Sequence, residues 1–144
     1  MTRIDFYILK DVDMDARMRF ACTLTARAVD GGHPVFIRAA DEAAVAILDD
    51  FLWRYPANRF LPHVVGNQQG NDAAVCIHTT PPANCDGLMI NLGDDVPDFY
   101  GRFERVAEIV VGANRDAGRQ HYRRYRHRGN PLHHHELDDW EAGA

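Results

Sequence analysis

The chain has 144 residues, of which 46% are hydrophobic and 26% charged, and its formal net charge at pH 7 is -5. These values are typical of one globular domain with a substantial core, and they exclude a disordered chain. No run approaches 18 consecutive apolar residues, and the apolar run at residues 4–9 is too short for a signal peptide, so we expect a cytoplasmic protein without a membrane partner. The three cysteines match no disulfide framework, which agrees with a reducing compartment.

The first half of the chain predicts two strands, each followed by a helix. Residues 3–9 are typical of a buried strand, and Val35-Phe36-Ile37 of a second, shorter one. The first helix is capped by Asp13 or Asp15, ends at Gly31-Gly32, and carries an apolar set spaced i, i+3, i+4, i+7: Ala21, Leu24, Thr25 and Ala28. Asp41 caps the second helix, whose expected core-facing residues are Ala44, Ile47, Leu48, Phe51 and Leu52.

The second half predicts three more strands, at residues 75–77, 88–92 and 108–111, before an arginine-rich helix. Short apolar strands bracketed by helices indicate an α/β fold with a mostly parallel sheet and helices on both faces. Residues 129–144 change character, because three histidines are followed by acidic residues. We therefore expect an α/β domain at residues 1–128 and a C-terminal tail at residues 129–144 that is at most partly ordered.

The sequence carries no sign of a nucleotide-binding loop, a metal site or a catalytic nucleophile. The first strand-to-helix turn, residues 10–15, has no glycine and three carboxylates, and neither GxGxxG nor GxxxxGK[ST] occurs. Cys76, His78 and Cys85 lack the spacing of a zinc site, and the adjacent histidines 133–135 cannot all face one ion on regular backbone. Serine is absent, which excludes a serine hydrolase. We expect no cofactor and no enzymatic activity.

The last predicted helix carries a stripe of basic residues, although the chain as a whole has a net negative charge. At about 100° per residue, one face collects five side chains within roughly a 100° arc: Arg115, Arg119, Tyr122, Arg123 and Arg126. A basic face can simply complement the negative end of a helix. An aromatic ring among the guanidinium groups favours an acidic partner that also carries an apolar anchor.

A second candidate surface follows the second helix, at residues 51–63. This proline-punctuated run holds more large anchors than one helix face can bury, among them Trp53 and Phe60. Trp, Tyr and Arg are enriched at interface hot spots. The alternative is a loop that folds onto its own core.

Six short motifs, in this order and spacing, resemble those of one known family. They are Phe6-Tyr7-Ile8-Leu9, Gly32-His33-Pro34-Val35, Leu52-Trp53, Phe60-Leu61-Pro62-His63, Ile90-Asn91-Leu92 and Arg119-Gln120-His121-Tyr122-Arg123-Arg124-Tyr125-Arg126. From about residue 5 to residue 128 the chain resembles the chi subunit of the bacterial DNA polymerase III holoenzyme, an accessory protein of the clamp loader. The resemblance implies a Rossmann-like sheet without a nucleotide site.

The resemblance also implies two protein partners. One is the acidic C-terminal tail of single-stranded DNA-binding protein, whose binding positions fall on Arg115, Arg119 and Arg123, with Tyr122 as an aromatic wall. The other is the psi subunit, or in some members a DNA-repair helicase, whose surface falls on Trp53, Phe60 and Pro62. Contact with DNA would then be indirect. A different class of function stays open, in which the arginine helix binds single-stranded nucleic acid directly through cationic and aromatic contacts.

Overall fold

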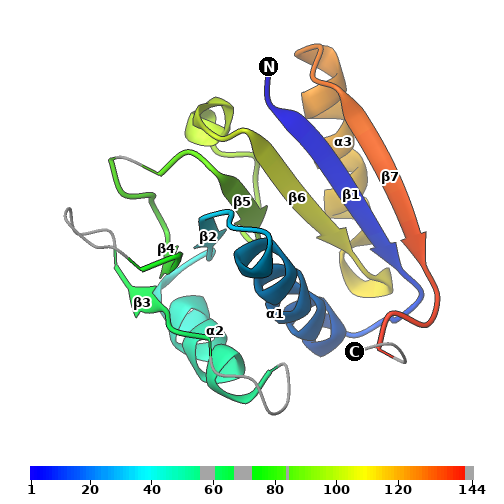
Figure 1. Cartoon of the computed structure of the whole chain (residues 1–144). Coiled ribbons are helices and arrows are strands. Elements are labelled where there is room, and N and C mark those ends of the chain that lie inside the picture. The colour runs from blue at the N-terminus through cyan, green and yellow to red at the C-terminus, as the bar shows by residue number, and fades with distance from the viewer. Residues whose placement is uncertain (56–60, 67–72, 84, 142–144) are drawn as a thin grey trace.

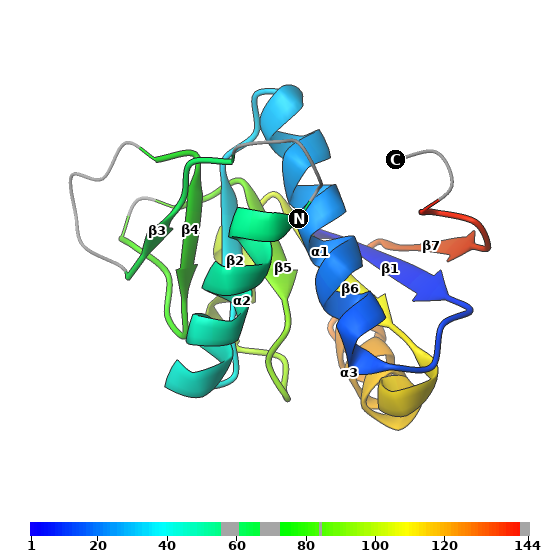
Figure 2. The ribbon, with the colours of Figure 1, turned by 90° about the horizontal axis from the view of Figure 1, so that it is seen from below.

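The computed structural model describes residues 1–55, 61–66, 73–83 and 85–141. Within these residues, seven strands form one sheet in the order β3-β4-β2-β5-β6-β1-β7, and every neighbouring pair is parallel. Helices α1 and α2 lie on one face of the sheet (Figure 1), and α3 lies on the opposite face from α1 (Figure 2). The prediction of an α/β fold with a parallel sheet and helices on both faces is confirmed.

All five predicted strands and all three predicted helices are present, with ends that shift by up to a few residues. In chain order the elements are β1 (Arg3–Leu9), α1 (Met14–Asp30), β2 (Val35–Arg38), α2 (Glu42–Arg54), β3 (Val64–Val65), β4 (Val75–His78), β5 (Leu88–Asn91), the 3-10 helix η1 (Asp98–Arg102), β6 (Arg105–Val110), the 3-10 helix η2 (Gly112–Asn114), α3 (Arg115–His127) and β7 (Leu132–Leu137). Strands β3 and β7 were not predicted.

The cap of α2 is as expected, because the Asp41 carboxylate accepts a 2.8 Å hydrogen bond from the Ala44 backbone N–H. Asp13 occupies the corresponding position of α1 without a side-chain hydrogen bond. The core-facing set of α2 was wrong at Ile47, whose side chain is 49% exposed. Val45, Leu48 and Leu52 are the buried residues, since a helix on a sheet buries only a narrow stripe.

Strand β1 serves both faces of the sheet, because successive side chains of a strand point to opposite sides. Ile4 and Phe6 belong to the core under α3, and Leu9 belongs to the core under α1 and α2. Tyr7 packs against this second core and is half-buried. The two faces of β1 therefore contribute to two separate hollows.

The C-terminal tail, expected to be at most partly ordered, contributes a strand to the sheet. Strand β7 pairs with the outer edge of β1 over six residues, from Ile4 with Leu132 to Leu9 with Leu137. Trp140 is buried beyond it: its ring lies 5.2 Å from that of Phe20, and its indole N–H donates to Asp11 at 3.1 Å. The polar composition of the tail hid this strand, which closes an edge that β1 would otherwise leave unpaired.

Candidate functional site

Helix α3, which carries the predicted basic stripe, is connected to the end of β6 by the short 3-10 helix η2. The side chain of Asn114 accepts a hydrogen bond from the Val111 N–H at 2.7 Å and donates one to the Ile109 carbonyl at 3.0 Å. These bonds tie the turn before the helix to the end of the strand. The arginines therefore stand on a rigid element rather than on a loop.

Three buried residues hold the inner face of α3 on the sheet: Gly118, His121 and Tyr125. Glu108 of β6, itself buried, accepts hydrogen bonds from the Tyr125 hydroxyl at 2.6 Å and the Asn91 amide at 2.7 Å, and its other oxygen lies 2.9 Å from Nδ1 of His121. A buried carboxylate with this many partners fixes the rotation of the helix.

The titration of His121 is coupled to this cluster. Burial alone lowers the pKa of His121, but the hydrogen bond to Glu108, the charge of Glu108 and the hydrogen bond to the Asp94 carbonyl outweigh it, so the pKa lies above the ordinary 6.5. Burial, with Glu108 close by, raises the pKa of Tyr125, which keeps the hydroxyl protonated as a donor.

The flank of α3, where the helix meets the sheet, forms one wall of a groove of about 430 Å³. All four residues of the predicted basic site line it: Arg115, Arg119, Tyr122 and Arg123. The fifth residue of the stripe, Arg126, lies beyond the lining. The helical spacing thus brings the predicted side chains to one hollow.

The floor and the far wall of the groove come from residues that sequence reasoning missed. They are Phe6 and Ile8 of β1, Val110 of β6, Gly118 of α3 and His134 of β7. The Tyr122 ring lies 5.6 Å from that of Phe6 and 5.2 Å from that of His134. The alternation of Phe6 and Ile8 along β1 is a sequence signal for a shared face, whereas His134 gave none because its segment looked unstructured.

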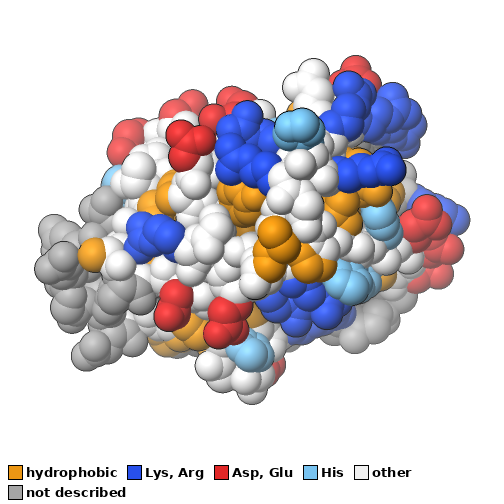
Figure 3. Space-filling view, turned by 90° about the horizontal axis from the view of Figure 1, so that it is seen from above, with side chains coloured by type: hydrophobic (Ala, Val, Ile, Leu, Met, Phe, Trp, Pro, Cys, Tyr) orange, Lys and Arg blue, Asp and Glu red, His pale blue; other side chains and the backbone are white. Residues whose placement is uncertain are grey.

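The charge at the groove is concentrated on its rim. Arg115 and Arg123 form no ion pair within the described ranges, and Arg119 has only an exposed contact of 3.5 Å with Asp116 on the same helix. Arg124 points to another side of α3, where it lies 3.6 Å from Asp98. Figure 3 shows Lys and Arg side chains gathered over the end of the molecule that holds α3. An apolar floor beneath free guanidinium groups suits an acidic segment with one apolar side chain.

The second predicted surface lies at the end of α2, on a different part of the molecule. Trp53 is 52% exposed, and its ring lies 4.5 Å from that of His63, which is 2.7 Å from the Asp49 carboxylate. Pro62 is exposed, while Phe60 lies outside the described residues. The alternative that this loop buries its anchors in the core does not hold for Trp53.

The turn that follows β1, where many α/β sheets place a nucleotide, is fixed by backbone hydrogen bonds. The turn after β1 is joined to η2, since Gly112 N–H donates to the Asp11 carbonyl at 3.0 Å and Ala113 N–H to the Val12 carbonyl at 2.9 Å. The thiol of Cys76, one of the three residues weighed as zinc ligands, donates a hydrogen bond to the Gly66 carbonyl at 2.6 Å. In the part of the chain that is described, no three His, Cys, Asp or Glu side chains are grouped to hold a metal, and no helix is long and apolar enough to span a bilayer.

Comparison with known proteins decides the family. The family model described as DNA polymerase III chi subunit, HolC, matches residues 1–133. The chain belongs to the DNA polymerase III chi subunit family. The DNA polymerase III subunit chi of Pseudomonas aeruginosa is 39% identical over 139 residues, which cover 95% of this chain and 98% of that protein.

Two further chi subunits are more distant. That of Haemophilus influenzae is 29% identical over 86% of this chain and 90% of its own length, and that of Escherichia coli K12 is 27% identical over 88% and 92%. The resemblance drawn from the motifs is confirmed. A chi subunit is an accessory protein of DNA replication. The family model ends at residue 133, within β7.

Proposed function

We propose that this chi-family chain is a non-enzymatic adaptor that links the polymerase III clamp loader to the acidic C-terminal tail of single-stranded DNA-binding protein. The observation that carries the proposal is the α3 groove, where Arg115, Arg119 and Arg123 stand around an apolar floor. A replication protein with this role works in the cytoplasm.

The chemistry of such a tail fits the groove. A segment of aspartates and a proline that ends in phenylalanine presents carboxylates, including its α-carboxylate, next to one ring. Each guanidinium can form charge-assisted hydrogen bonds to a carboxylate, which contribute about 1.5–3 kcal/mol apiece. The ring would pack on Phe6 and Tyr122, whose ring centroids lie 5.6 Å apart in an edge-to-face arrangement.

The second end of the adaptor is the surface of Trp53, Phe60 and Pro62, which we assign to the psi subunit or to a DNA-repair helicase. The half-exposed indole supports this assignment, because exposed tryptophan is costly for solubility and valuable at an interface. DNA would be reached only through the partners.

Direct binding of single-stranded nucleic acid is the competing function. The exposed arginines at the end of α3 favour it, and the net charge of -5 opposes it.

Capture of single-stranded DNA-binding protein tests both functions at once. We expect this chain to retain the full-length protein and to lose it when the last few residues of that protein are removed. A free acidic peptide ending in phenylalanine should compete, and an oligonucleotide should not. Retention of the shortened protein, or competition by the oligonucleotide alone, would transfer the function to nucleic-acid binding.

A further inference from the structure

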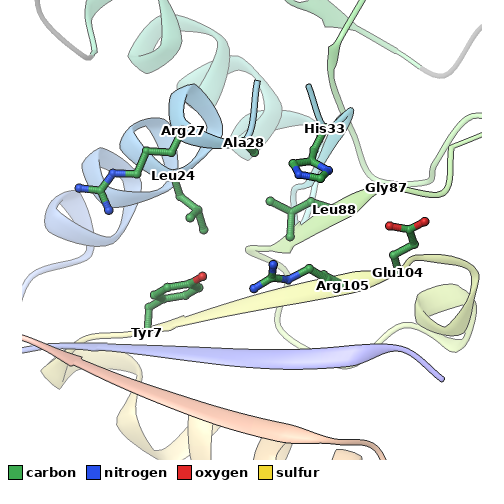
Figure 4. Close-up of a pocket in the computed structure, with 9 residues that line it drawn as sticks. All are labelled: Tyr7, Leu24, Arg27, Ala28, His33, Gly87, Leu88, Glu104 and Arg105. Carbon is green, nitrogen blue, oxygen red and sulfur yellow. The ribbon is translucent and has the colours of Figure 1, made fainter. Parts of the chain in front are cut away.

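A second hollow lies on the opposite face of the sheet from the α3 groove. It has a volume of about 210 Å³, room for several water-sized groups, and lies between the last turn of α1 and the first residues of β5 and β6. Its apolar lining comes from Leu24, Ala28 and Leu88. Figure 4 shows the Tyr7 hydroxyl and the Arg105 guanidinium pointing toward one another beneath Leu24.

A buried carboxylate positions the basic side chains beside this hollow. Arg105 donates from Nε and Nη2 to one oxygen of Asp5 at 3.3 and 3.1 Å, and Arg3 donates from the same two nitrogens to the other oxygen at 3.2 and 3.0 Å. His135 of β7 lies 2.9 Å from Asp5 as well. Both guanidinium groups are thus held in place while Nη1 of Arg105 keeps its donors for another group.

Two cationic side chains, Arg27 and Arg105, and one anionic side chain, Glu104, line the hollow. Burial raises the pKa of the Asp5 carboxyl, but hydrogen bonds from His135, Arg3 and Arg105 outweigh it, so the pKa lies below its ordinary value. Asp5 is therefore ionised, and its single negative charge is paired with the two positive charges of Arg3 and Arg105. Arg27, in the last turn of α1, is exposed and forms no ion pair with any residue that the structure describes. Glu104 also lines the hollow, but its carboxylate stands at the end away from Arg27 (Figure 4).

Two backbone carbonyl groups of residues that line the hollow already have hydrogen-bond partners. The carbonyl oxygens of Arg27 and Ala28, at the end of α1, accept hydrogen bonds from Gly31 at 3.1 Å and His33 at 2.9 Å. The exposed His33 ring adds a further polar group to the rim. Figure 3 shows basic side chains with histidine beside them on the α1 side, apart from the group over α3.

We propose that this hollow is an oxyanion-binding site for a carboxylate or phosphate that carries a short apolar group. Guanidinium donors and the Tyr7 phenol would hold the oxygens, and Leu24 and Leu88 would cover the apolar part. Such a ligand is smaller than the acidic tail of the proposed function, because this hollow has about 210 Å³ against about 430 Å³ for the α3 groove, and the two sites lie on opposite faces of β1.

Titration of the ¹⁵N-labelled protein with sodium butyrate and, separately, with inorganic phosphate tests the site, with chloride keeping the ionic strength constant. We expect millimolar binding that shifts the amide signals of Leu24, Ala28 and Leu88. Binding by butyrate more tightly than by phosphate assigns a carboxylate with an apolar stem, and the reverse order assigns a phosphate.

Variants decide whether the named side chains make the site. Arg105→Ala should weaken binding about tenfold and Arg27→Ala by a smaller factor, whereas Arg54→Ala, in the last turn of α2 and outside the hollow, should have no effect. Arg27 forms no ion pair with the residues that the structure describes, so its variant keeps the test valid if Arg105→Ala fails to fold. Unshifted signals at the hollow, shifts confined to α3, or equal affinity in the wild type and both variants would overturn the proposal.

Discussion

Gly118 of α3 lies so close to Val110 of β6 that a Cβ atom added to the glycine would stand 2.9 Å from Val110 Cγ2. This contact sets the depth of the groove, because both residues line it and the helix cannot approach the sheet this closely with any larger side chain.

Gly118→Ala should therefore lower the free energy of unfolding by about 1 kcal/mol. Overpacking costs about 1–3 kcal/mol, and it opposes the gain of about 1 kcal/mol in helix propensity. Chemical denaturation measures the change. Gly101→Ala is the matched control, since nothing lies within 4 Å of a Cβ there. If Gly118→Ala is stabilising, α3 is not held by this contact. Pairing it with Val110→Ala should recover part of the loss.

His134→Ala should weaken binding of the acidic tail peptide by about 0.5–1.5 kcal/mol, the range for one aromatic contact. The ring lines the groove and lies 5.2 Å from that of Tyr122. His133→Ala removes the same side chain from the next position of β7, which faces the other side of the sheet. Calorimetry that finds the two variants equal would remove β7 from the site.

The pair of His121 and Glu108 should make stability depend on pH. The folded-state pKa of His121 is raised, so its contribution is fully present below about pH 6.5 and is lost as the pH rises through the folded-state pKa. As the pH rises above about 6.5, the melting temperature of the wild type should fall more than that of His121→Gln, whose side chain cannot titrate. Parallel curves for the two proteins would show that the pair does not stabilise the fold through charge.

Trp53→Ala should leave the melting temperature within a few degrees of the wild type, because the side chain is 52% exposed. Binding of psi or of a helicase should be lost, and binding of the tail peptide should be unchanged, since distant sites act additively. A loss of stability of about 3–5 kcal/mol would instead mark Trp53 as a core residue. Weaker binding of both partners would show that the two ends are not separable.

The fold was predictable because apolar strands that alternate with capped helices are typical of α/β chains. The basic stripe was predictable because the spacing of side chains along a helix is regular. The remainder of the groove was not. Val110 and Phe6 join it through sheet pairing between distant segments, which one sequence does not display. His134 was missed because β7 is polar: it gains stability from the unpaired edge of β1 and from Trp140 beyond it, rather than from its own apolar pattern.

The second hollow, between α1 and the first residues of β5 and β6, was also unpredictable because its residues are distant in the sequence. Asp5 and Arg105 are a hundred positions apart, and the parallel register of β1 with β6 sets them near each other. The only signal in the sequence was Asp5, a carboxylate inside an apolar strand, and its role cannot be inferred until the side chains that pair with it are known.

Calorimetric titration of the tail peptide into the wild type, Arg119→Ala and Arg124→Ala measures whether the α3 groove binds the tail. Both variants lose one arginine from α3, but only Arg119 lines the groove. Loss of about 1.5–3 kcal/mol of binding free energy in Arg119→Ala, with Arg124→Ala close to the wild type, is the predicted result. Equal affinities for all three proteins, or equal losses in both variants, would contradict the assignment of the groove as the site of the tail.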